Sequence, residues 1–448
     1  MITHNNSSNF DSEFFRNQIE ILSGGYFPEF DQQDRAKIEN GFDYEKVLQT
    51  SFYQDRFDKN EVESKLTNEN FNNSFVKPNT ISDFQIVPQS NKSVDLFNVE
   101  SIRKDFPILN EKVDGKNFLI WLDNAATTQK PKAVIDSQVE YYEAYCANTH
   151  RSNFGHANKA TQEFEKTRVL LKEFINASKN EEIIFTKGVT ESINFIASSF
   201  AKDFKTVIIS SLEHHSNIVP WHMQGRTLGA GLEVVNCDKN LNFDLAHFEE
   251  LLKTNPNAFV SITHISNAFG KIHDIKNIIK LAHEYGAIVM VDGAQSLAHF
   301  KINVQELDVD FFAISGHKTF APTGVGAIYV KEKYLKDVKP YQTGGATIHE
   351  VDFTGSTLLD SPYKFEAGTQ NIAGIIGFGK AIEYINYVKY ENIESIEKNV
   401  FKFLDEELSK LPGIIFYNDM DNCIGSRSFN FEGLIHDDIG ILDRKSVV

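Results

Sequence analysis

Short apolar runs recur between residues 182 and 318, and each ends in small or polar residues. Continuous runs of this length are typical of strands buried on both faces of a sheet. A helical pattern with one apolar face separates two of them, over Lys271–Tyr285. This alternation predicts an α/β fold with a mainly parallel sheet. The predicted strands are Glu182–Phe185, Thr206–Ser210, Ala258–Ile262, Ile288–Val291 and Asp310–Ile314.

Two of these runs end in side chains suited to chemistry. Asp292 follows one run, and Lys318 follows another after Ser315, Gly316 and His317. In open α/β sheets, ligands bind outside the carboxyl ends of strands. A desolvated lysine there loses its charge more readily and can form a Schiff base with an aldehyde. A carboxylate can keep the ring nitrogen of pyridoxal phosphate (PLP) protonated.

Each residue alone also has an ordinary explanation. Lys318 fits a solvated strand end, and Asp292 fits a helix N-cap. Together they favour a PLP site. The Gly188-Val189-Thr190 run follows a third strand and opens a helix, where free N–H groups attract phosphate. Thr190 also fits a simple capping residue, and the two roles are compatible.

Several separated motifs resemble those of one enzyme family. VDGAQS (Val291–Ser296), SGHK (Ser315–Lys318) and EHHSN (Glu213–Asn217) are similar to motifs of the group II, SufS-type cysteine desulfurases, within the class V aminotransferases. The resemblance covers roughly Val99 to Asp443. It implies the PLP-dependent transferase fold type I, which is aspartate aminotransferase-like.

The resemblance also implies a domain organisation. Residues 121–371 are expected to form the large PLP-binding domain, with a mainly parallel seven-stranded sheet. Residues 96–120 and 372–448 are expected to form a smaller α/β C-terminal domain. Residues 1–95 are rich in Asn, Gln, Ser, Asp and Phe. We expect them to be a partly helical extension with a flexible linker, and no catalytic constellation is evident there.

The resemblance assigns roles to individual residues. It implies that Lys318 and His214 are catalytic, with the His214 imidazole stacked on the cofactor ring. Asn267 corresponds to an asparagine that hydrogen-bonds the phenolic oxygen, although a turn asparagine is the ordinary alternative. Thr369 corresponds to a residue that reaches the phosphate of the neighbouring subunit, which implies a homodimer. The expected cofactor-binding residues are Lys318, Asp292, Gln295, His214, Asn267, Val189, Thr190, Ser315, His317 and Thr369.

The implied reaction converts L-cysteine to L-alanine. The freed Lys318 amine moves the α-proton, and a cysteine thiolate of the protein takes the substrate sulfur as a persulfide. The sulfur then passes to an acceptor protein of the SufE or SufU type for iron–sulfur cluster assembly.

The C-terminal sequence departs from the family pattern. His436–Asp443 resembles the helix before the catalytic loop, which should carry Arg-x-Gly-x-x-Cys, but Arg444–Val448 follows instead. We therefore expect the catalytic cysteine and the substrate-binding arginines to be missing and sulfur transfer to be impaired. A fragment or a frameshifted product explains this pattern best. Cys423 lies upstream and fits a structural cysteine.

Composition narrows the alternatives. The net charge of −17 argues against a nucleic-acid surface. The three cysteines form no Cys-x-x-Cys pair, so we expect neither a metal site nor a disulfide framework, and a reducing compartment is indicated. No apolar run of ~20 residues predicts a membrane span. The N-terminus lacks a basic region followed by an apolar core, so the cytoplasm is expected.

Two other functions fit the same sequence. A selenocysteine lyase shares the scaffold and depends less on a protein thiol, because selenium leaves more easily. A non-catalytic subunit would bind a sulfur carrier or pair with an intact copy. An aminotransferase of the same fold fits less well, because EHHSN and SGHK together point to the desulfurase branch.

Overall fold

The computed structural model describes residues 99–112, 118–150, 154–200, 204–417, 422–435 and 439. The predicted N-terminal extension lies outside the described residues, as does nearly all of the segment His436–Asp443. The division into a large and a smaller domain stays a prediction.

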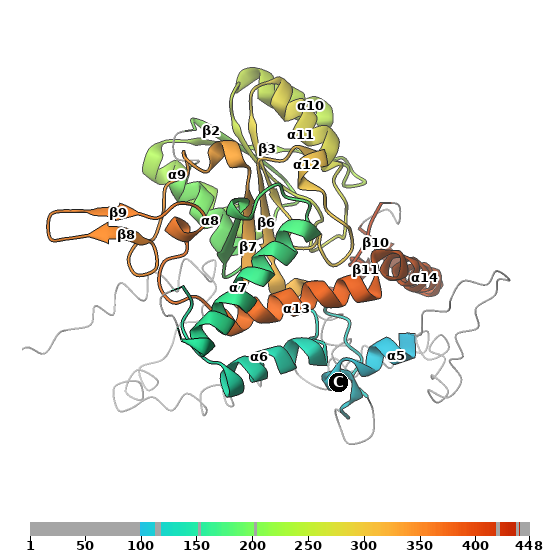
Figure 1. Cartoon of the computed structure of the whole chain (residues 1–448). Helices are drawn as coiled ribbons and strands as arrows, with labels where there is room; N and C mark the ends of the chain where they lie inside the picture. Colours follow the sequence, from blue (N-terminus) through green and yellow to red (C-terminus); the bar gives the residue numbers. More distant parts are fainter. Residues whose placement is uncertain are drawn as a thin grey trace, which may run out of the picture. The chain divides into compact units, whose positions relative to one another are not determined.

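A seven-stranded sheet forms the centre of the molecule, in the order β1-β7-β6-β5-β4-β2-β3 (Figure 1). Only β7 runs against its neighbours, since it pairs antiparallel with both β1 and β6 while the remaining pairs are parallel. The predicted mainly parallel sheet is therefore confirmed. The strands are β1 (Ile183–Thr186), β2 (Thr206–Ser210), β3 (Gly231–Val235), β4 (Phe259–Thr263), β5 (Ile288–Asp292), β6 (Phe311–Ser315) and β7 (Gly326–Val330).

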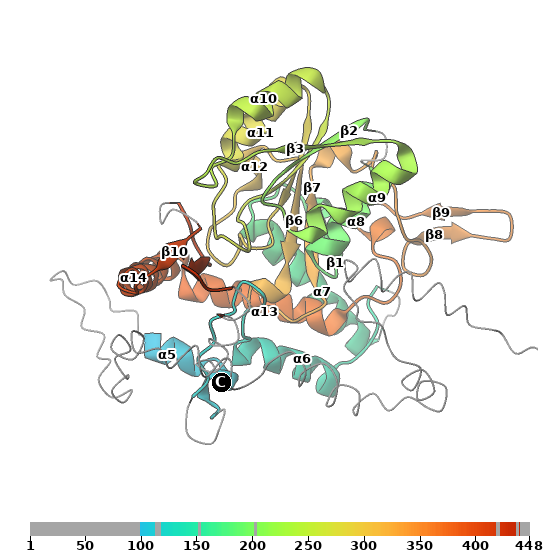
Figure 2. The ribbon, with the colours of Figure 1, turned by 180° about the vertical axis from the view of Figure 1, so that it is seen from behind.

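Helices cover both faces of this sheet (Figure 2). Buried side chains of α8 (Val189–Ser199) and α9 (Val219–Leu228) belong to the apolar cluster on one face. The other cluster takes side chains from several helices, among them α7 (Gly155–Phe174), α10 (Leu245–Thr254), α11 (Ile275–Glu284) and α13 (Ile372–Val388). Because both faces are covered, β4, β6 and β7 are buried along their whole length.

The sequence pattern places the predicted elements well. All five predicted strands are present, as β1, β2, β4, β5 and β6. The helix predicted over Lys271–Tyr285 begins at Ile275, because the Asp274 side chain caps it by accepting the Asn277 N–H at 3.2 Å. Its predicted apolar face, Ile275, Ile278, Ile279 and Ala282, is buried.

The remaining elements flank this sandwich. The helices are α5 (Val99–Lys104), α6 (Lys132–Ala144), α12 (Val304–Leu307) and α14 (Tyr390–Leu408), and the strand pairs are β8 (Ile348–Val351) with β9 (Ser356–Leu358) and β10 (Ile414–Phe416) with β11 (Phe429–Phe431). The hairpin β8–β9 projects from the body of the molecule (Figure 1). In the described part of the chain, no helix combines the length and apolarity that crossing a membrane requires.

A buried ion pair fixes the loop before α13 against the sheet. Arg168 of α7 donates to both carboxylate oxygens of Glu366, at 2.8 and 2.9 Å, and both side chains are almost fully buried. Arg168 also donates to Ile183 O at 2.7 Å, and the Phe185 N–H donates to Glu366 at 2.8 Å. The pair therefore joins α7, β1 and the segment leading to Thr369.

We predict that Glu366→Gln lowers the free energy of unfolding by about 3 kcal/mol, because it leaves the buried Arg168 charge without its closest carboxylate. Urea denaturation of the purified chain measures this. Glu332→Gln is the matched control, because Glu332 pairs with Lys179 on the surface and its loss should cost less than about 1 kcal/mol. Equal effects of the two substitutions would contradict the prediction.

Candidate active site

Lys318 ends a tight turn, η6 (Gly316–Lys318), directly after β6. The Gly316 N–H donates to Val325 O at 3.0 Å. A side chain at Gly316 would place its Cβ 2.7 Å from the same oxygen, so the turn requires glycine. The Lys318 side chain is half-buried. Burial lowers the pKa of Lys318, and the nearby Asp292 carboxylate only partly opposes this shift. The amine therefore loses its proton more readily than a surface lysine.

Asp292 is the last residue of the neighbouring strand β5 and is 3% exposed. Its Oδ1 accepts the Ala294 N–H at 2.9 Å. Burial raises the pKa of Asp292, while the Ala294 N–H and the charges of Lys318 and His214 oppose that shift. A buried carboxylate of this kind gains most from a cation placed against it.

His214 precedes the turn η5 (His215–Asn217), which follows β2. Its Nδ1 accepts the Ser216 N–H at 3.1 Å, so the proton of the neutral ring lies on Nε2. Burial, and then the positive charge of Lys318, lower the pKa of His214. The ring is therefore neutral at neutral pH. Lys318 follows β6, His214 follows β2 and Asp292 ends β5, so the three residues lie at the carboxyl edge of the sheet. Their charges are close enough to affect one another's pKa values.

The start of α8 forms the second part of the site. Gly188, at φ +147°, turns the chain from β1 into the helix. The Val189 N–H donates to Ser315 Oγ at 3.2 Å, and Thr190 Oγ1 lies 2.8 Å from Ser216 Oγ. The first N–H groups of a helix have no partner inside it. Together with these hydroxyls, they form an arrangement that fits a phosphate group.

A third group of contacts holds the peptide of His317, and sequence reasoning did not find it. The His317 carbonyl accepts from Thr127 Oγ1 at 3.1 Å, from the Thr128 N–H at 3.0 Å and from Lys130 Nζ at 3.0 Å. Burial lowers the pKa of Lys130 to about 8. Burial also lowers the pKa of His317, with Lys318 and Lys130 adding to the shift. These residues are distant in sequence from His317, so no local pattern indicates the contact.

The other predicted residues lie around this cluster. Gln295 Nε2 donates to Ala125 O at 2.7 Å, which ties the loop after β5 to the segment before α6. Asn267 is half-buried, and its carbonyl accepts from Ser426 Oγ at 3.2 Å. Thr369 is exposed on the loop before α13. Among the described residues, no hydrogen bond joins Thr369 to the Lys318 cluster.

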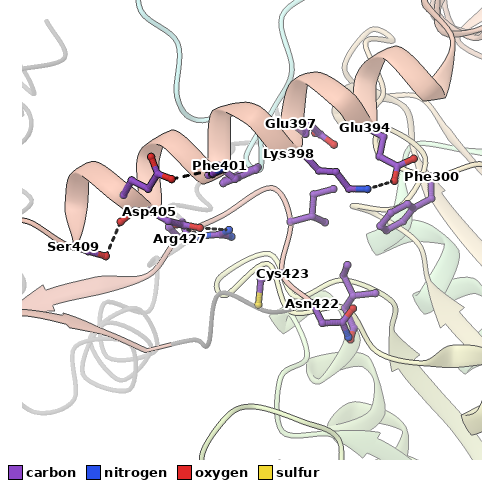
Figure 3. A pocket seen from close by; sticks show the side chains of 14 residues that line it. Phe300, Glu394, Glu397, Lys398, Phe401, Asp405, Ser409, Asn422, Cys423 and Arg427 are labelled. Atoms are coloured by element: carbon purple, nitrogen blue, oxygen red, sulfur yellow. Dashed lines mark hydrogen bonds and ion pairs between the residues drawn. The ribbon is translucent and has the colours of Figure 1, made fainter. Parts of the chain in front are cut away.

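A groove of about 690 Å³ lies between α14 and the segment around Cys423, and none of the predicted site residues lines it (Figure 3). Arg427 pairs there with Asp405, at 2.7 and 2.9 Å, and stacks on Phe401. Cys423 lines the groove, and its backbone pairs with Lys271. Within the described residues, no cluster of His, Cys, Asp and Glu has the arrangement of a metal site.

Comparisons with known proteins identify the family of the chain. The family model described as aminotransferase class-V matches residues 120–448. The chain therefore belongs to the class-V aminotransferase family.

Within that family, its similar relatives are cysteine desulfurases. The chain is 40% identical to the cysteine desulfurase of Synechococcus elongatus over 78% of its own length and 56% of that protein. It is 39% identical to the probable cysteine desulfurase of Halalkalibacterium halodurans, over 78% of this chain and 87% of the relative. The solved apo structure of the cysteine desulfurase from Thermococcus onnurineus has a TM-score of 0.72 and 38% identity, covering 78% of this chain and 86% of that one.

The coverage differs among these relatives. The chain spans about half the length of several curated cysteine desulfurases that it matches, from 48% to 56%. Activity, substrate and partners of the whole protein are therefore argued below as proposals.

We predict that Asp292→Asn stabilises the ligand-free chain at neutral pH by about 1 kcal/mol, because it removes a buried charge and keeps an oxygen for the Ala294 N–H. The pKa of Asp292 is raised above its ordinary value of 3.8. The native state therefore holds this proton longer than the unfolded chain, and wild-type stability falls as pH rises from 3.8 through the raised pKa.

Urea unfolding at several pH values tests this. The stability difference between Asp292→Asn and wild type should grow from acid to neutral pH. Asp360→Asn, at an exposed position, serves as the control. A variant at position 292 that is less stable than wild type at neutral pH would overturn the prediction.

Proposed function

We propose that this chain binds PLP through Lys318 and acts on L-cysteine as a cysteine desulfurase. The observation that carries the proposal is the placement of Lys318, Asp292 and His214 at the carboxyl ends of β6, β5 and β2, at the sheet edge where α8 also begins. Class-V aminotransferases and their cysteine desulfurase members are PLP-dependent. The relatives at about 40% identity support the same activity.

The side chains of the cluster fit this cofactor. Asp292 would face the ring nitrogen, because a buried carboxylate with a raised pKa is stabilised by a protonated pyridine. His214 would lie flat against the ring as a neutral imidazole. Val189, Thr190 and Ser315 would hold the phosphate at the α8 N-terminus. When bound, the cofactor supplies an electron sink for the substrate carbon.

Lys318 has two roles in the proposed reaction. Its amine would first hold the cofactor covalently and then, once displaced by the amino group of L-cysteine, take the α-proton. A lowered pKa suits both roles, because the nucleophile and the base are the neutral amine. The contacts of Thr127, Thr128 and Lys130 with the His317 carbonyl would keep the backbone beside Lys318 fixed during both steps.

Sulfur transfer depends on a thiol, and the three cysteines of the sequence have other surroundings. Cys146 contacts Tyr141, and Cys237 contacts Ser211. Cys423 lies in the groove beside α14. Burial raises the pKa of Cys237, which disfavours the reactive thiolate. We therefore propose that these 448 residues carry out the carbon chemistry and transfer sulfur poorly.

The finer features of the proposal rest on the motif resemblance and on exposed side chains. A group II, SufS-type subtype, a role in iron–sulfur cluster assembly with a SufE- or SufU-type acceptor, and a cytoplasmic location follow from the motif resemblance. The exposed Thr369 and the exposed hairpin residues Val351 and Phe353 support a homodimer, since apolar side chains at such a position gain from a protein cover.

We predict that the wild-type chain binds PLP with a visible absorption band that shifts when L-cysteine is added. Borohydride reduction followed by peptide mass spectrometry should find the pyridoxyl group on Lys318. Lys318→Ala should lose both the covalent link and the band. Lys187→Ala is the control, because Lys187 is an exposed lysine beside the α8 N-terminus. Labelling of another lysine would show that the site assignment is wrong.

We predict that sulfur release from L-cysteine by these 448 residues is at least about tenfold slower than by a relative with a reactive thiol at the site, because burial disfavours the Cys237 thiolate and Cys423 lies in the groove beside α14. Assays of alanine and of protein persulfide measure this.

Efficient alanine release from L-selenocysteine alone would favour the lyase alternative. Binding of an acceptor protein without turnover of either amino acid would favour the non-catalytic one. Robust persulfide formation from L-cysteine would contradict the prediction of slow sulfur release.

A further inference from the structure

Glu213 directly precedes His214, and its carboxylate is buried behind the proposed site, with the residue 8% exposed. Its Oε1 accepts from Ser210 Oγ at 2.5 Å, at the end of β2, and from the Thr263 N–H at 2.9 Å, at the end of β4. Its Oε2 accepts from Asn217 Nδ2 at 2.6 Å, in the turn η5. One carboxylate therefore joins two strand ends and the turn that follows His214.

The network continues into the core through Asn217. Asn217 Oδ1 accepts from Trp221 Nε1 at 3.0 Å and from Ser261 Oγ at 2.6 Å, and its Nδ2 also donates to Ser261 O at 3.2 Å. Asn217, Ser261 and Trp221 are almost completely buried. The Asn217 side chain accepts hydrogen bonds through its oxygen and donates them through its nitrogen, so its orientation is fixed. Its Nδ2 must therefore face an acceptor at position 213.

The same turn sets the orientation of His214. The Asn217 N–H donates to His214 O at 2.7 Å, and the Ser216 N–H donates to His214 Nδ1. The ring and the main chain of His214 are thus both tied to the turn that Glu213 holds. Glu213 therefore acts on the position of His214 without contacting a ligand itself.

We propose that Glu213 is a positioning residue for His214: its ionised carboxylate holds the turn η5 against β2 and β4, so that the imidazole is oriented for the cofactor. This inference rests on the proposed function, since it assigns the reason why the site needs Glu213. It explains a glutamate that the motif EHHSN contains and that the resemblance left without a role.

The carboxyl group of Glu213 gains or loses its proton near neutral pH. Burial raises its pKa to about 7, against the opposing hydrogen bonds of Ser210, Thr263 and Asn217, and Asp292 on β5 adds to the rise. Cys237 after β3 is the other titratable group affected by Glu213. On the ligand side, the charged groups are Lys318 and, when protonated, His214. Below about pH 7 Glu213 takes up a proton, and the oxygen that carries it becomes a donor and a weaker acceptor, which weakens its hold on the turn.

The test compares Glu213→Gln with wild type in the full chain. The glutamine amide cannot satisfy all three donors, because its NH₂ group would face either the Asn217 amide or the Ser210 and Thr263 donors. Ser210→Ala is the second variant, because it removes one of the three donors to the carboxylate and keeps the Glu213 charge. Glu233→Gln is the matched control, on the exposed face of β3.

PLP affinity is measured by fluorescence titration between about pH 6 and pH 8.5, and thermal unfolding of the ligand-free chain is followed in parallel. We expect Glu213→Gln to bind PLP about tenfold more weakly at pH 8, equivalent to one lost charge-assisted hydrogen bond. Wild type and Glu233→Gln should lose affinity as pH falls through about 7. Glu213→Gln should lack this component, and Ser210→Ala should shift it to higher pH, because the lost hydrogen bond held the pKa of Glu213 down.

Each outcome decides the inference. A variant with lower thermal stability but with wild-type PLP affinity and pH profile would show that Glu213 is merely structural, while the proposed function stands. Failure of the wild-type chain to bind PLP would overturn the proposed function and the positioning role with it. If Glu213→Gln does not fold, Ser210→Ala carries the test, and wild-type PLP affinity with an unchanged pH profile in that variant overturns the proposal.

Discussion

The site depends on a close approach of three backbone segments. The space between them leaves no room for a Cβ atom. A Cβ at Gly326 would overlap both the Ile314 carbonyl and the Gly188 backbone, and one at Gly316 would crowd Val325. These glycines let the antiparallel strand β7 lie against β6 and against the turn that opens α8. As a result Ser315 reaches the Val189 N–H. Lys318 is thereby presented at the same edge of the sheet as the helix N-terminus.

The pKa values of buried carboxylates shift in opposite directions at the two ends of this sheet. Asp310, just before β6, is fully buried but meets His283, Lys331 and Lys333, and the His283 and Val289 donors outweigh burial so that its pKa is lowered. At the carboxyl ends, burial dominates and raises the pKa values of Asp292 and Glu213. Unbalanced buried charge of this kind marks functional sites more often than structural ones, because it costs stability that only a ligand restores.

Sequence patterns predicted those helices and strands whose secondary structure and buried face can be recognised from their own residues. Apolar runs with both faces buried identified five strands of the sheet, and the spacing of Ile275, Ile278 and Ile279 identified the buried face of α11. Lys318 and Asp292 were found because strand ends of a parallel sheet meet at one edge. His214, Asn267 and Thr369 were assigned through the motif resemblance, and their roles stay predictions.

Other features depend on partners far along the chain, which no local pattern reveals. Strand β3 was missed because it is largely exposed and includes a charged residue, Glu233. The hairpin β8–β9 was missed because its strands are exposed and carry little apolar signal. The hydrogen bond from Lys130 to His317 spans 187 positions, and the ion pair of Arg168 with Glu366 spans 198.

The proposed reaction separates into two parts with different structural requirements. Its carbon chemistry needs a neutral amine, a buried carboxylate, a flat ring and an anion site, and the residues proposed for them lie at strand ends, turns and a helix start beside the central sheet. Such anchoring gives the precision that proton transfer at a bound substrate demands. Sulfur transfer needs only a thiolate able to approach the substrate, and that requirement places no constraint on the sheet. The scaffold can therefore retain cofactor binding and proton transfer independently of the group that accepts sulfur.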